Sequence, residues 1–134
     1  MKRILLMLLV LAVLALGVSS SFAADSLTNT TDFDKAVSDA QSQNKKILLI
    51  FDQDSCYYCD LLKKNTLSNQ ELVSKLNDGY ITVIVDVNKQ PQLASKYQVF
   101  GTPVMIFLDS NQNKIGQIEG YVDANKFLDY IKGI

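Results

Sequence analysis

Two cysteines are the residues of this chain best suited to chemistry, and they lie three positions apart at Cys56 and Cys59. On the first turn of a helix, two thiols at that spacing can close a disulfide with little backbone movement. The first thiol would lie where unpaired N–H groups and the helix dipole favour the reactive thiolate. The second would be shielded, and could resolve a mixed disulfide. The pair is therefore predicted to catalyse thiol–disulfide exchange.

Three other interpretations of the pair are open: a structural disulfide, half of a metal site, and two core thiols. A bridge across three residues closes too short a loop to stabilise a fold much. The chain has no histidine and no other cysteine, so a four-ligand zinc site of Cys and His cannot form within one chain. Haem attachment needs histidine after the second cysteine, where Asp60 stands. These observations favour redox chemistry, and the missing histidine also excludes Ser–His–Asp and Cys–His nucleophile pairs.

A buried strand and a helix are expected on either side of a turn that leads to Cys56. Residues 47–51 form a continuous apolar run, which suits a strand buried on both faces. Residues 52–55 read as the turn, and a helix is predicted over residues 56–67. A cysteine pair between a buried strand and a helix is the usual context of a redox motif.

The rest of the chain alternates between helical and strand patterns. Ser68 and Glu71 have capping-box spacing, which predicts a helix from there to about residue 77. Further helices are predicted over residues 32–43, over residues 91–97 and after Asp123, and further strands over residues 81–87, 104–108 and 114–119. The last two strands are joined by a short turn and should pair antiparallel. The expected fold class is α/β, with a central mixed sheet of about four strands and helices on both faces.

Length and composition indicate one globular domain without a nucleic-acid footprint. The chain has 134 residues, 48% of them hydrophobic and 20% charged, and a formal net charge of −1. This composition argues against disorder, and the charge balance gives no basic patch for nucleic acid.

The N-terminus has the three-part layout of a secretory signal. Lys2 and Arg3 precede an apolar run over residues 4–18, and Ser21 and Ala23 are small residues that suit cleavage after Ala23. The apolar run has 15 residues, whereas a bilayer span needs about 20. An uncleaved membrane anchor is the alternative.

We therefore expect a signal peptide over residues 1–23, a linker over residues 24–31 and one domain over residues 32–134. The mature protein would lie in the periplasm or elsewhere outside the cytoplasm, where disulfides persist. Processing would leave 11 basic side chains against 14 acidic ones, a net charge of −3.

The order and spacing of these motifs resemble the thioredoxin superfamily over residues 32–134. The resemblance rests on the strand at residues 47–51, the cysteine pair at a helix start, Gly101-Thr102-Pro103 before a strand, and Gly120 after the last strand. The chain looks similar to periplasmic thioredoxin-like proteins, such as those of sulfur oxidation and the C-terminal domain of the transmembrane thiol:disulfide interchange reductase.

The resemblance implies a thioredoxin-like fold in which Pro103 is cis and faces the cysteines. It also implies that the backbone of Thr102 pairs with substrate backbone. Tyr57 and Tyr58 would flank the site, either as a contact platform for a protein substrate or merely exposed or packed on Pro103. Such a protein acts as a monomer on protein disulfides without a cofactor. A thiol donor, for which a membrane reductase is one candidate, would supply its electrons.

Three positions depart from thioredoxin itself. Ser55 replaces the tryptophan before the first cysteine, Ile50 replaces a buried acid, and Ile84 aligns with the lysine that partners that acid. Asp52 could replace the acid as proton acceptor for the second cysteine, although a solvated turn residue is the favoured interpretation. The first strand that precedes the opening helix in thioredoxin is expected to be absent.

Three functional hypotheses follow: an oxidoreductase, a thioredoxin-like adaptor module with a structural disulfide, and a dimer that bridges an iron–sulfur cluster or metal. For the oxidoreductase, Asp52, Asp54 and Asp60 surround Cys56 in sequence, and nearby negative charge disfavours a thiolate. Strong oxidants have a stabilised thiolate, so a reductant or isomerase-like role is predicted rather than that of a primary oxidant.

Overall fold

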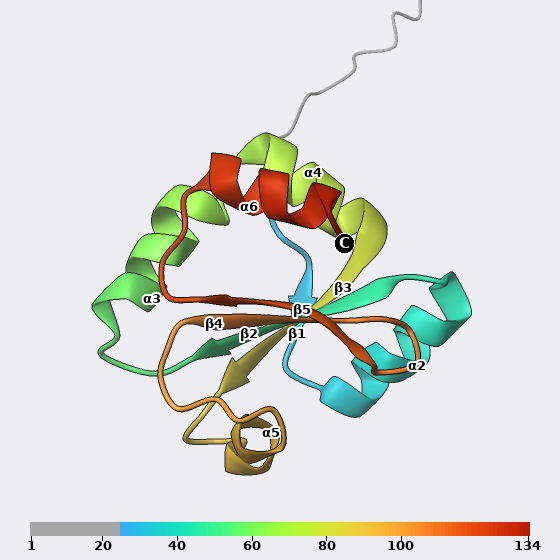
Figure 1. Ribbon diagram of the computed structural model, residues 1–134, viewed down its shortest axis with the longest axis horizontal. Helices are drawn as coiled ribbons and strands as arrows, with labels where there is room; N and C mark the ends of the chain where they lie inside the picture. The colour runs from blue at the N-terminus through green and yellow to red at the C-terminus, as the bar shows by residue number, and fades with distance from the viewer. Residues whose placement is uncertain (1–24) are drawn as a thin grey trace, which may run out of the picture.

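A computed structural model describes residues 25–134; the signal peptide expected over residues 1–23 lies outside this part of the chain. In chain order the elements are β1 (Asn29–Thr30), α2 (Phe33–Gln43), β2 (Lys46–Asp52), α3 (Tyr57–Leu61), the π-helical η1 (Leu62–Thr66), α4 (Gln70–Gly79), β3 (Tyr80–Asp86), α5 (Pro91–Lys96), β4 (Val104–Leu108), β5 (Lys114–Glu119) and α6 (Ala124–Lys132). Helices α3, α4 and α6 lie on one face of the sheet, and α2 and α5 lie on the other (Figure 1). None of the helices within residues 25–134 is long and apolar enough to cross a membrane.

The sheet has five strands in the order β1-β3-β2-β4-β5. Strands β1 and β2 run parallel to β3, whereas β4 is antiparallel to both β2 and β5. The predicted α/β class, mixed sheet and antiparallel final pair are confirmed. The expected strand number of about four is one too low, because β1 was not foreseen.

Strand β1 corrects the prediction that no strand precedes the first helix of the domain. Asn29 pairs with Thr82 of β3, and Asn77 holds the residues just before β1. The Asn77 side chain accepts a hydrogen bond from the Thr28 backbone at 2.9 Å and donates one to the Ser26 carbonyl at 3.0 Å. Residues 25–31 are therefore attached to the domain rather than forming a free linker. A strand of two polar residues, preceded by a residue that Asn77 binds from 49 positions away, gives no periodic signal in the sequence.

Strand β2 is buried on both faces along its apolar run, as the sequence predicts. Ile47, Leu49 and Phe51 pack into the core beside α2 and α5. Leu48 and Ile50 pack into the core beneath α3, α4 and α6. Because alternate side chains of a strand point to opposite faces, both cores hold β2 in place. The turn that leads to Cys56 thus leaves the end of a rigid strand.

The helix predicted over residues 56–67 divides into α3 and η1. Leu62 is buried beneath it, and the Thr66 hydroxyl donates a hydrogen bond of 2.6 Å to the Val122 carbonyl. The wider turn of a π-helix often occurs at functional sites. Here Thr66 ties the segment after the cysteines to the chain that follows β5.

The next helix begins one residue later than the capping-box pattern predicts. Asn69 is the cap, and its side chain accepts a hydrogen bond of 3.0 Å from the Leu72 backbone. The Ser68 hydroxyl instead donates to the Lys64 carbonyl at 2.5 Å. The Ser68 side chain therefore bonds four residues back into the π-helical turn instead of capping α4.

Strand β5 is held against α6 by a contact that requires a glycine. A Cβ atom at Gly116 would lie 2.6 Å from the Tyr130 hydroxyl, so only glycine lets the ring lie this close. The same hydroxyl accepts a hydrogen bond of 2.7 Å from the Gln117 backbone. This contact positions the strand that ends beside Pro103.

Candidate active site

Cys56 and Cys59 are joined by a disulfide with their Cα atoms 5.2 Å apart. Cys56 is the cap residue of α3, and Cys59 lies within its first turn. Cys59 is 1% exposed, whereas Cys56 is partly exposed. The two cysteines therefore differ in their access to solvent: Cys56 lies at the start of α3, whereas Cys59 lies on its buried side.

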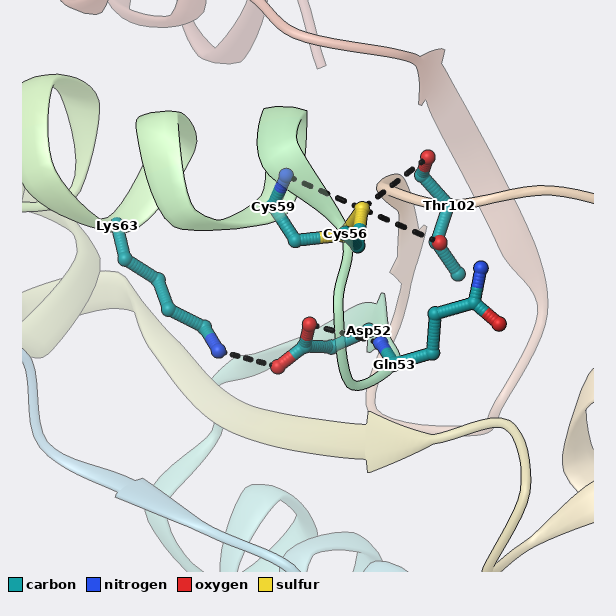
Figure 2. Close-up of polar contacts among 6 residues, drawn as sticks. All are labelled: Asp52, Gln53, Cys56, Cys59, Lys63 and Thr102. Carbon is teal, nitrogen blue, oxygen red and sulfur yellow. Dashed lines mark hydrogen bonds and ion pairs between the residues drawn. A yellow bond between two sulfur atoms is a disulfide. The ribbon is translucent and has the colours of Figure 1, made fainter.

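The Cys56 sulfur is surrounded by polar groups from two distant segments, as Figure 2 shows. The Cys59 backbone N–H donates to it at 3.2 Å, and the Thr102 hydroxyl donates to it at 3.4 Å. The Thr102 carbonyl oxygen lies 3.6 Å away. Both donors would also stabilise a thiolate at Cys56, since donors to the charged form favour it.

Pro103 directly follows Thr102, which contacts the Cys56 sulfur. The Thr102–Pro103 peptide bond is cis, and Pro103 is buried. The Pro103 carbonyl accepts a hydrogen bond of 2.8 Å from the backbone of Gly120, which has φ +79°. A positive φ favours glycine, so Gly120 allows the chain to turn away from β5 at this point.

Tyr57 and Tyr58 are both exposed, and their rings contact each other edge to face at a centroid distance of 5.2 Å. Neither ring is packed away against the protein, and a contact platform and simple exposure both stay open. The two rings form an aromatic surface directly after Cys56. Exposed aromatic groups of this kind are common at protein interfaces.

Asp52 is not the solvated turn residue that the sequence favoured. It is the last residue of β2, and its side chain is only 14% exposed. Its carboxylate forms an ion pair with Lys63 and accepts a hydrogen bond of 2.8 Å from the Gln53 backbone (Figure 2). Ile50 points into the core from the same strand, so this acid lies two residues further along than the thioredoxin one. Lys63 of η1 covers the Asp52 carboxylate, and the pattern of residues along the strand does not reveal this contact.

Sequence reasoning did not single out Phe100, Glu119 or Tyr121, which lie on the segments around Thr102, Pro103 and Gly120. Phe100 is 95% exposed, and Tyr121 is also exposed. Phe100 and Glu119 line a groove of about 280 Å³ together with Thr102 and Pro103. The sequence shows only an apolar residue before Gly101 and an acid at a strand end, so no local signal identifies a groove.

Comparisons with known proteins agree with this geometry. The family profile described as a thioredoxin-like domain matches residues 33–134. The thiol:disulfide interchange protein DsbD of Campylobacter jejuni is 30% identical over 119 residues, which are 86% of this chain and 21% of that protein. DsbD of Photorhabdus laumondii is 30% identical over 97 residues, 69% of this chain and 17% of that protein. The chain spans about a fifth of the length of these relatives.

Solved structures show the same fold at lower identity. A DsbH oxidoreductase has a TM-score of 0.74 and 20% identity, over 88% of this chain and 90% of that one. The oxidised C-terminal domain of DsbD from Neisseria meningitidis has a TM-score of 0.64 and 20% identity, over 81% of this chain and 98% of that one.

Proposed function

Because the chain belongs to the thioredoxin-like family of disulfide oxidoreductases, we propose that it exchanges disulfides with exported protein substrates through Cys56 and Cys59. The observation that carries the proposal is the asymmetry of the pair. A partly exposed sulfur at a helix start receives two hydrogen bonds, and its bonded partner is 1% exposed. An attacking thiol must be accessible, whereas a resolving thiol must be shielded from competing partners.

The reaction proceeds through a mixed disulfide. The Cys56 thiolate attacks one sulfur of the substrate disulfide, and the other substrate sulfur leaves as a thiolate that takes up a proton. The Cys59 thiol then loses its proton and attacks the Cys56 sulfur. The bond to the substrate breaks, and the Cys56–Cys59 disulfide forms. The substrate gains two electrons and two protons, and an external thiol donor returns the pair to its reduced form by the same exchange.

We assign Asp52 as the acceptor of the proton that leaves the Cys59 thiol. Its carboxylate is held by Lys63, which lies one helical turn beyond Cys59. Asp52 lies on the strand beneath this helix, with its side chain largely shielded. An acid held in place in this way can accept a proton without exposing the second sulfur to solvent.

Thr102 and Pro103 are assigned to substrate binding, with Tyr57 and Tyr58 as flanking contacts. Thr102 contacts the reactive sulfur through its hydroxyl, so an extended peptide pairing with its backbone would bring a disulfide to Cys56. The tyrosine pair presents exposed aromatic area next to the same sulfur. This arrangement suits a monomer that binds unrelated protein disulfides in turn.

Reduction of insulin disulfides with a small dithiol as electron donor tests the activity. The protein is expected to accelerate insulin reduction above the rate of the dithiol alone. An adaptor module with a merely structural disulfide would bind partners without accelerating this reaction. A rate equal to the chemical background would therefore favour the adaptor.

The reduction potential of the pair tests the direction of electron flow. Asp54 and Asp60 are exposed on either side of Cys56, while Lys63 is engaged by Asp52. This charge pattern makes the Cys56 thiolate less stable than the reactive thiolate of a strongly oxidising protein. We expect a potential nearer the thioredoxin value of about −270 mV than the about −120 mV of the strongest oxidants, which suits a reductant or isomerase-like role. Equilibration with glutathione measures it, and a value above about −150 mV would reverse the direction.

We also propose that the domain acts outside the cytoplasm. Residues 1–23 would be removed as a signal peptide, with an uncleaved anchor as the alternative. A cleaved signal peptide and an uncleaved anchor would both place the cysteines outside the cytoplasm, where a membrane reductase is a suitable electron donor. The intact mass of the protein recovered from cells distinguishes the processed from the unprocessed chain.

A further inference from the structure

The exposed large apolar side chains within residues 25–134 lie on the segments that carry the disulfide or adjoin Thr102 and Pro103 in sequence. They are Tyr57, Tyr58, Phe100 and Tyr121. The two tyrosines directly follow Cys56, and Phe100 lies two residues before Thr102, which contacts the Cys56 sulfur. Tyr121 follows Gly120, whose backbone bonds to Pro103. Apolar side chains concentrated at one place on a surface indicate a contact site for another molecule.

The groove beside Thr102 combines one of these aromatic rings with a carboxylate. Phe100 and Glu119 both line it, and Glu119 is the charged residue of its lining. Thr102 belongs to the groove and donates to the Cys56 sulfur at 3.4 Å. A side chain bound in the groove would therefore be a near neighbour of a cysteine reacting at Cys56.

The Glu119 carboxylate is oriented but not neutralised by an ion pair. The Gln117 amide nitrogen donates to one of its oxygens at 2.6 Å, while the Gln117 amide oxygen accepts from Lys114. Within residues 25–134, no ion pair involves Glu119, Asp54 or Asp60. Lys63 is bound to Asp52, and Lys114 is linked to Glu119 only through the Gln117 amide. The groove thus offers a carboxylate at Glu119 as well as an aromatic ring at Phe100.

We propose that this groove binds a lysine or arginine side chain of the protein substrate, next to the substrate's disulfide cysteine. The proposal rests on the thiol–disulfide exchange proposed above and adds the class of substrate. A cationic group is attracted both to the face of an aromatic ring and to a carboxylate. An acidic side chain at the same place would meet the Glu119 carboxylate, so like-charge repulsion would select against it.

Three disulfide peptides that differ only in the residue next to one cysteine test the proposal. The three peptides carry Lys, Gln or Glu at that place. The value of kcat/KM for their reduction should be highest for the Lys peptide, intermediate for the Gln peptide and lowest for the Glu peptide. We expect about a tenfold difference between the extremes at low ionic strength, and a smaller one at high salt. Glu119→Gln should bring the three values together, and Glu119→Lys should invert their order.

Glu71→Gln is the matched control, because Glu71 is exposed on α4 and does not line the groove. It removes the same charge and should leave the order of the peptides unchanged. Equal kcat/KM for all three peptides with the unaltered protein, or the same loss of order in both Gln variants, would overturn the cationic preference while leaving the exchange reaction in place. Failure to reduce any peptide or insulin would remove the proposed function as well.

Discussion

Replacing Cys56 with serine is expected to lower the rate of insulin reduction to that of the chemical donor alone. Without the accessible sulfur, no mixed disulfide with the substrate can form, and Cys59 is too buried to replace it. The same assay should give a different result for Cys59→Ser. This variant keeps the attacking thiol and the hydrogen bond from Thr102, but it lacks the group that releases the substrate.

Cys59→Ser should therefore accumulate mixed disulfides with protein substrates, visible as higher-mass species that a reductant dissolves. Brief alkylation of the reduced, unaltered protein provides an independent check, since Cys56 should be modified well before Cys59. Equal labelling of the two thiols, or full activity of Cys56→Ser, would contradict the assigned roles.

Replacing Phe107 with alanine is expected to destabilise the protein by about 3–5 kcal/mol. Phe107 is 0% exposed on β4, the strand that follows Pro103. Its ring centroid lies 5.9 Å from that of Tyr80, 5.8 Å from that of Phe127 and 5.3 Å from that of Tyr130. Truncation removes all three aromatic contacts and leaves a cavity between the sheet and α6.

Phe100→Ala is the matched control for this prediction, because the same ring is lost from a side chain that is 95% exposed. Its free energy of unfolding should change by less than about 0.5 kcal/mol. Urea unfolding of the oxidised proteins measures both values, and a two-state transition is expected for a domain of this size. A small loss for Phe107→Ala, comparable with that of Phe100→Ala, would contradict the core derived from the structure.

Local sequence patterns were sufficient for the central strand and for the position of the cysteines. The apolar run at residues 47–51 lies within β2, and α3 begins directly after Cys56. Both features depend on interactions within a few residues: alternation of side chains along a strand, and unpaired N–H groups at a helix start. The identity of Cys56 and Cys59 as the candidate reactive pair therefore follows from spacing and context.

The same kind of pattern failed where a distant group determines the local structure. Strand β1 pairs with β3, and Asn77 of α4 holds the residues just before β1. Asp52 is shielded because Lys63 reaches it from the helix above. Each of these contacts joins residues that sequence reasoning treats in separate windows.

The sequence therefore identifies the reactive sulfurs and the core strand, whereas the surroundings of the sulfurs depend on tertiary packing. Thr102 contacts Cys56 across 46 positions because β4 lies antiparallel to β2, which brings the start of one strand to the end of the other. Phe100 and Glu119 meet in one groove because Gly120 bonds to the Pro103 carbonyl. The burial, exposure and charge of a site depend on every element that packs around it. They are therefore determined only when the chain has folded.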